Sequence, residues 1–146
     1  MKNKISAVTA FHKAFRLGVN NTPTTDIDVD TMRLRFSLMD EENKEYLDAI
    51  KNKDLIEVAD ALGDMLYILC GTIITHGMQD VIDEVFEEIQ QSNMSKLGND
   101  GKPIYREDGK VLKGPNYFRP DIARILKQYI KPSHATHKGR ELDYIV

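Results

Sequence analysis

The stretch LIEVADALGDMLYILCGTIITH, residues 55–76, decides the fold of this protein. It is apolar almost all the way round a helical projection, and after its first turn the only charged residues are Asp60 and Asp64. A run of this length is too long for an ordinary strand, and a helix that is apolar on every side is a buried helix. Asp54 is a suitable N-cap and Gly77 a suitable stop. We therefore predict a central core helix between these two residues.

The segments on either side of this core helix predict further helices, because apolar residues recur in them at helical spacing. The expected ranges are 3–16, 30–51, 80–93 and 121–129. Asp108-Gly109 lies between two short apolar runs and predicts a small β-hairpin near residues 100–112. The sequence thus predicts an all-α bundle of four to five helices with one hairpin excursion. It forms one domain, residues 1–130, followed by a polar tail, residues 131–146.

Length and composition set the broad class of protein. A chain of 146 residues, 41% of them apolar, is one globular domain by default. Its single cysteine, Cys70, excludes an intrachain disulfide framework and fits a reducing cytoplasm. Charged residues interrupt the first apolar segment, which argues against a secretory signal. The longest uncharged apolar run, residues 65–75, is too short to cross a bilayer, so we expect a cytoplasmic protein with no membrane partner.

Charge is distributed unevenly along the chain. Residues 40–64 carry nine acids and three lysines, a net charge of -6, whereas residues 96–140 carry eleven bases and four acids, a net charge of +7. The two segments are either an acidic metal site with a basic phosphate clamp or two solvated faces of opposite sign. A calculated pI of about 5.8 argues against a nucleic-acid partner.

Acidic residues also lie where helices should face their neighbours. In the predicted helix 30–51, Glu41 and Glu45 continue the stripe that Leu34 and Leu38 begin. In the core helix, Asp60 and Asp64 lie on one face with Glu57.

Burying an ionised carboxylate without a partner costs several kcal/mol, so a cation is expected nearby. Arg33 or Arg35 could supply it in a buried ion-pair network, and so could a divalent metal. Oxygen-only ligands favour Mg²⁺ or Mn²⁺ over zinc.

Glu41-Glu42-x-x-Glu45 followed by Glu57-x-x-Asp60 resembles the EExxE…ExxD signature of the all-α NTP pyrophosphohydrolases, which include MazG, dimeric dUTPases and phosphoribosyl-ATP pyrophosphohydrolase. Three further strings are similar to the MazG-like or phosphoribosyl-ATP-pyrophosphohydrolase-like branch. They are DALGDMLYILCGT (60–72), SNMSKL (92–97) and DGKVLKGPNYFRPDI (108–122). The resemblance extends over residues 5–127.

The resemblance implies Mg²⁺, with Mn²⁺ as the second choice, held by acids of both motifs. The implied metal ligands are Glu41, Glu42, Glu45, Glu57, Asp60 and Asp64. Asp64 is included because in a second register it takes the place of the ExxD aspartate, with Ala61 where the glutamate should be. Glu41 or Glu45 would be the general base towards water. The implied substrate-binding residues are Asn93, Lys96, Lys110 and Lys113.

The implied activity is hydrolysis of a nucleoside triphosphate to a monophosphate and pyrophosphate, in nucleotide-pool cleaning. Within the branch that the chain resembles, dUTP or another dNTP is the expected substrate. Phosphoribosyl-ATP is less expected, because a Tyr-His-Leu-Leu-Val string after the aspartate is absent. The resemblance also implies a homodimer or homotetramer with active sites at subunit contacts. The competing hypothesis is a non-catalytic helical assembly protein whose acids form a buried ion-pair network.

Overall fold

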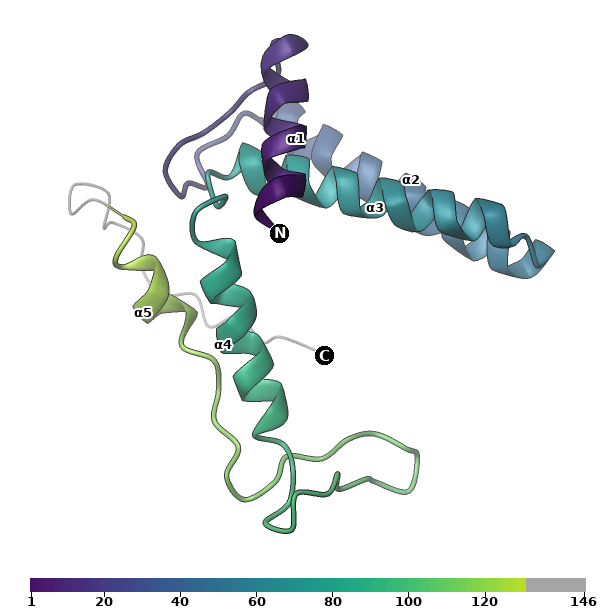
Figure 1. Ribbon diagram of the computed structural model, residues 1–146, viewed down its shortest axis with the longest axis vertical. Helices are drawn as coiled ribbons and strands as arrows, with labels where there is room; N and C mark the ends of the chain where they lie inside the picture. Colours follow the sequence, from purple (N-terminus) through teal and green to yellow (C-terminus); the bar gives the residue numbers. More distant parts are fainter. Residues whose placement is uncertain (131–146) are drawn as a thin grey trace.

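A computed structural model describes residues 1–130 of the chain (Figure 1). The helices are α1 (Lys2–Ala14), α2 (Val29–Asn52), α3 (Leu55–Thr75), α4 (Ile82–Met94) and α5 (Ile122–Leu126). No strand forms within this part of the chain, so the predicted all-α class is confirmed. The tail predicted at residues 131–146 lies outside the described residues.

Helices α2 and α3 form a long antiparallel arm, which extends to the right in Figure 1. Lys53, in the left-handed region at φ 56°, turns the chain between them. Asp54 then caps α3 by accepting hydrogen bonds from the N–H groups of Ile56 and Glu57, as predicted. At the other end of the arm Asp28 caps α2, slightly before the predicted start.

The core lies where α1 crosses the C-terminal half of α3. Ile5 and Val8 of α1 are buried there against Cys70, Ile73 and Ile74 of α3. The apolar residues that recur at helical spacing in α1 therefore pack on the second half of the predicted core helix.

The first half of α3 is not covered within one chain. Leu55 is 78% exposed, Ile56 79% and Leu62 50%. The expectation that this helix is buried on all sides is therefore wrong for the single chain, because α2 covers one side and no other described element covers the rest. By length and composition α3 would also be able to cross a membrane, a criterion that the core helix of a water-soluble protein meets as well.

Helix α4 leaves the end of α3 and points away from the arm, towards the bottom of Figure 1. The chain then loops out and returns to α5, which packs on α4. Glu88 of α4 holds this return by accepting from the backbone N–H of Asp121, at 2.8 Å, and from Arg124, at 3.1 Å. The predicted hairpin reduces to one antiparallel bridge, Tyr105 with Val111, and forms no strands.

Candidate active site

The face of α2 that packs on α3 runs through Thr31, Arg35, Leu38, Glu42 and Ala49. Ala49 is buried, and the other four residues are partly buried. The spacing of this face is helical, but the face shares only Leu38 with the predicted stripe, whose other members Leu34, Glu41 and Glu45 are exposed. The expectation that the stripe of Glu41 and Glu45 faces the neighbouring helix is therefore wrong.

Glu42 is at the centre of a carboxylate cluster between the two arm helices. Its Oε2 atom is shielded from solvent and has no hydrogen-bond partner. Burial raises the pKa of the Glu42 carboxyl, and the negative charges of four nearby acids raise it further. Those acids, in decreasing order of effect, are Glu45, Asp64, Glu41 and Asp60. The fold thus brings together five of the six predicted acidic ligands, from two helices.

Glu57, the sixth predicted ligand, lies nearer the tip of the arm and does not influence the pKa of Glu42. Asp60 and Asp64 are exposed in the single chain, so the expectation of buried aspartates is wrong, for the same reason that α3 is partly uncovered. Arg35 makes no ion pair within residues 1–130, and neither does Arg33. The acids of the cluster are therefore not neutralised by either arginine that the sequence suggested.

The donor set of the cluster fits a hard divalent cation. All five acids offer carboxylate oxygens, which are the ligands that Mg²⁺ and Mn²⁺ prefer, and one of those oxygens is buried without a partner. Within residues 1–130 no three His, Cys, Asp or Glu side chains already converge closely enough to hold a metal ion. The carboxylates are neighbours whose side chains would have to turn towards a bound ion.

Three of the four predicted phosphate-binding residues, Asn93, Lys96 and Lys113, lie at the end of α4. Lys96 Nζ donates to Asn93 Oδ1 at 2.9 Å. The segment 113–118 is fastened to the same place, because Ser92 Oγ donates to the carbonyl of Phe118 at 2.8 Å. The backbone N–H of Phe118 in turn donates to Ser95 Oγ at 3.2 Å. The two serines thus hold the chain rather than present free hydroxyl groups.

Gly114 allows segment 113–118 to pack directly against the backbone that follows α4. A Cβ atom added at Gly114 would collide with the backbone carbonyls of Leu97 and Lys96, so only glycine fits here. Lys113, the residue before it, lies over the ring of Tyr117, with Nζ 4.5 Å from the ring centre. We call Asn93, Lys96 and Lys113 the basic clamp. Lys110 stays outside it, in the exposed turn where its N–H is bonded to Asp108.

Three hollows in the described part of the chain lie away from the carboxylate cluster, and one of them, at the N-terminus, is lined by residues 1–4 and Asp83. Another, of about 260 Å³, is lined by buried His12, by Asn20 and by Arg35, whose Nε atom is buried without a partner. Burial lowers the pKa of Arg35. Sequence reasoning gave His12 no role, and its place on the apolar side of α1 was the signal that it would be buried.

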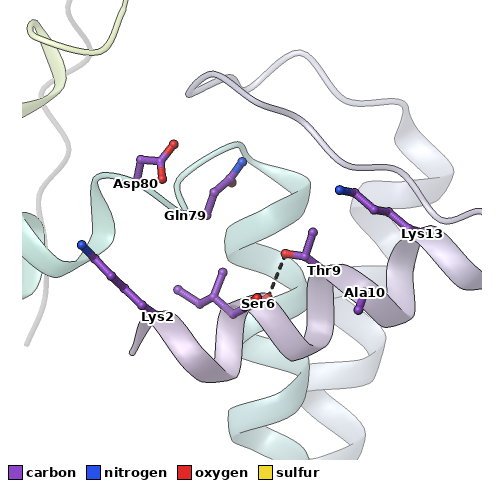
Figure 2. Close-up of a pocket in the computed structure, with 8 residues that line it drawn as sticks. Lys2, Ser6, Thr9, Ala10, Lys13, Gln79 and Asp80 are labelled. Carbon is purple, nitrogen blue, oxygen red and sulfur yellow. Dashed lines mark hydrogen bonds between the residues drawn. The ribbon is translucent and has the colours of Figure 1, made fainter.

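The third hollow, of about 460 Å³, runs along α1 beside the α3–α4 connection (Figure 2). Lys2 and Lys13 lie towards its two ends, and Gln79 and Asp80 line its far side. Thr9 in its wall donates its hydroxyl to the carbonyl of Ile5. None of the predicted site residues lines it.

The family model for phosphoribosyl-ATP pyrophosphohydrolase (PRA-PH) matches residues 8–93, more than half of the chain. The chain belongs to this family. The matched range contains α2, α3 and all six predicted acidic ligands, so the resemblance of the acidic motifs to the MazG-like all-α NTP pyrophosphohydrolases is confirmed.

One solved structure that is similar to this PRA-PH chain is a candidate NTP pyrophosphohydrolase from Exiguobacterium sp. 255-15. It is 27% identical, and the match covers 86% of this chain and 95% of that one, with a TM-score of 0.47. Among curated proteins no sequence matches. Family membership supports pyrophosphate-bond hydrolysis of a nucleoside triphosphate in general.

Proposed function

We propose that this protein is a metal-dependent nucleoside triphosphate pyrophosphohydrolase that acts on a deoxynucleoside triphosphate, with dUTP as the first candidate. The observation that carries the proposal is the gathering of Glu41, Glu45, Asp60 and Asp64 around Glu42. So many carboxylates repel one another, and a divalent cation relieves that repulsion. Membership of the PRA-PH family supports the same general chemistry.

In the proposed site Mg²⁺, or Mn²⁺ in its place, is held by acids from both arm helices. A bound cation would neutralise phosphate charge and make the α-phosphorus more electrophilic. Glu42 and Asp60 are the proposed central ligands, with Asp64 and Glu57 available on α3. Glu41 and Glu45 are the more exposed acids of α2, and either can serve as the general base.

The reaction that these residues support is an in-line attack of water on the α-phosphorus. The general base takes one proton of the water as its oxygen bonds to phosphorus, and the bond from the α-phosphorus to the α–β bridging oxygen breaks. The products are a nucleoside monophosphate and pyrophosphate. Lys96, Lys110 and Lys113 are proposed to bind the β- and γ-phosphates as point charges, and Asn93 to donate a hydrogen bond.

The proposed setting is nucleotide-pool cleaning in the cytoplasm, by a homodimer or homotetramer with no nucleic-acid or membrane partner. The exposed apolar residues of the arm support self-association, since they need a cover that one chain does not provide. The remaining alternative is a non-catalytic assembly protein. It is disfavoured by membership of the PRA-PH family, whose description is that of an enzyme.

Pyrophosphate release from purified protein tests this proposal directly. The assay uses a panel of canonical and modified NTPs and dNTPs, with Mg²⁺, with Mn²⁺ and with EDTA. We expect metal-dependent release with a preference for one deoxynucleotide, lost in Asp60→Asn. Asp48→Asn is the matched control, because Asp48 lies on the same arm, pairs with Lys51 and has no influence on Glu42. A folded protein that releases no pyrophosphate from any triphosphate would refute the proposal.

A further inference from the structure

The hollow that His12 and Arg35 line lies on the same two helices as the carboxylate cluster, two turns further from the tip of the arm. Arg35 precedes Glu42 by seven residues in α2, and Gly71 follows Asp64 by seven residues in α3. Arg35 lies against Gly71, just as Glu42 lies close to Asp64. At 1.5 Å per residue the two places are about 10 Å apart along the arm. A nucleotide whose α-phosphorus is bound at the cluster can therefore reach the hollow with its base.

The guanidinium group of Arg35 lines this hollow without a partner. Its Nε atom is shielded from solvent and has no hydrogen-bond partner, and Arg35 makes no ion pair within residues 1–130. Burial lowers the pKa of Arg35, because the cation has lost water without gaining an acidic neighbour. A guanidinium group in this state is stabilised by a ligand oxygen that accepts hydrogen bonds from it.

The other groups that line the hollow favour a neutral ligand over a phosphate. Asp26 and Asp28 bring two carboxylates to the hollow, against the single positive charge of Arg35, so an anion would be repelled. Leu17 and Leu34, both of them exposed, add apolar walls. A volume of about 260 Å³ is near the lower end for ligand pockets and suits one small ring system.

His12 supplies a hydrogen-bond acceptor next to the Arg35 donor. His12 Nδ1 lies 3.0 Å from the carbonyl oxygen of Gly18, which can only accept, so Nδ1 carries the proton and Nε2 of the neutral ring is an acceptor. A Cβ atom at Gly71 would lie 3.0 Å from His12 Nε2 and 3.0 Å from Arg35 Nη1, so the two nitrogen atoms lie close together. A ligand edge that carries an N–H group next to a carbonyl oxygen is complementary to this pair.

We propose that this hollow binds the base of the substrate, with Arg35 donating to a base carbonyl and His12 Nε2 accepting from the adjacent ring N–H group. Uracil and thymine present this edge on a single ring. Cytosine and adenine instead place an amino group beside a ring nitrogen. That nitrogen has one lone pair, whereas a carbonyl oxygen has two and can accept from two N–H groups of a guanidinium. This inference rests on the proposed pyrophosphohydrolase function and adds the residues that select the base.

Arg35→Met tests the hollow through substrate selection. Methionine is similar in length and removes both the N–H groups and the unpaired charge, so the variant should fold. In the pyrophosphate-release assay we expect kcat/KM for dUTP to fall about 10- to 100-fold, and kcat/KM for dCTP to change much less. Arg33→Met is the matched control, because Arg33 is exposed on the same helix and does not line the hollow. Equal losses for the two substrates, or no loss, in a variant that melts like the wild type would overturn the inference and leave the proposed function standing.

Nucleosides test the hollow without phosphate, metal or turnover. Isotope-edited NMR of the wild type follows the side-chain nitrogen resonances of His12 and Arg35, which are assigned with His12→Gln and Arg35→Met. Deoxyuridine at millimolar concentration should shift both resonances, and deoxycytidine should shift them less. Deoxyuridine that shifts neither, or inorganic phosphate that shifts Arg35 as strongly, would overturn the inference. A wild type that releases no pyrophosphate would refute the proposed function, and the nucleoside shifts would decide separately whether the hollow binds a base.

Discussion

Glu42 of α2 and Asp64 of α3 approach each other across the helical arm, and the charge of Asp64 raises the pKa of Glu42. The two residues are distant in the chain and are brought together by the tight turn at Lys53. This pair links the EExxE motif of one helix to the apolar helix that follows it. Because of this pair we expect the chemistry to take place on the arm and not in the hollows beside α1.

Glu42→Gln should make the metal-free protein more stable at neutral pH. The folded-state pKa of Glu42 is raised, so its contribution to stability is fully present below the ordinary glutamate pKa and is lost as the pH rises through the raised value. Urea unfolding in EDTA from about pH 4 to about pH 8 should show wild type and variant diverging as the pH rises. Identical stabilities across that range would mean that Glu42 is not under strain from its neighbours.

Mg²⁺ should stabilise the folded protein, because it binds the native carboxylate cluster and relieves its repulsion. At 100 times its Kd a ligand adds about 2.7 kcal/mol to the free energy of unfolding. Thermal melting with and without Mg²⁺ should show an upward shift that Asp60→Asn greatly reduces and Asp48→Asn leaves intact. An equal shift in both variants would place the bound ion outside the cluster.

Asp60→Asn should separate catalysis from folding. Asp60 is exposed, so its stability change should stay within about 0.5 kcal/mol. Loss of a metal ligand removes several kcal/mol of transition-state stabilisation, so turnover should fall at least about 100-fold. Denaturant unfolding and pyrophosphate release on the same sample provide both readings. A large loss of stability with normal turnover would favour the assembly-protein alternative.

Gly71→Ala and Gly63→Ala should have opposite effects on stability, although both lie in α3. A Cβ atom at Gly71 would lie 3.0 Å from Arg35 Nη1 and 3.0 Å from His12 Nε2. The crowding should cost about 1–3 kcal/mol. A Cβ atom at Gly63 would meet nothing within 4 Å, so the better helix propensity of alanine should add about 0.5–1 kcal/mol. Thermal unfolding of the two variants is the measurement, and destabilisation by both would contradict the space seen at Gly63.

Gly114→Ala should damage the basic clamp and spare the core. The added methyl group would push segment 113–118 away from the backbone of Lys96 and Leu97. Triphosphate turnover should fall mainly through a higher KM, since phosphate binding is lost first. Hydrogen exchange should rise at Phe118 and remain unchanged in the buried half of α3. Gly18→Ala is the control, because a Cβ atom there meets nothing within 4 Å.

Much of the fold could be predicted because its signals are local. The apolar run of α3, the Asp54 cap and the motif acids are properties of neighbouring residues, and the structure has the predicted helices with small shifts of their ends. The sequence pattern predicted more β-structure near residues 100–112 than the structure contains. The turn at Gly109 forms, but the flanking residues make only one antiparallel bridge. No further strand of the described chain lies beside them to extend the pairing.

What the sequence determined by itself was therefore the type of each element, the identity of the acids and the family. Tertiary structure decided which acid faces α3, because the rotation of a helix about its own axis depends on packing against its partner and not on its own period. That rotation turned Glu42 inward and left Glu41 and Glu45 at its sides. Tertiary structure also separated the basic clamp from the carboxylates, since the direction in which α4 leaves α3 depends on long-range contacts that no local pattern encodes.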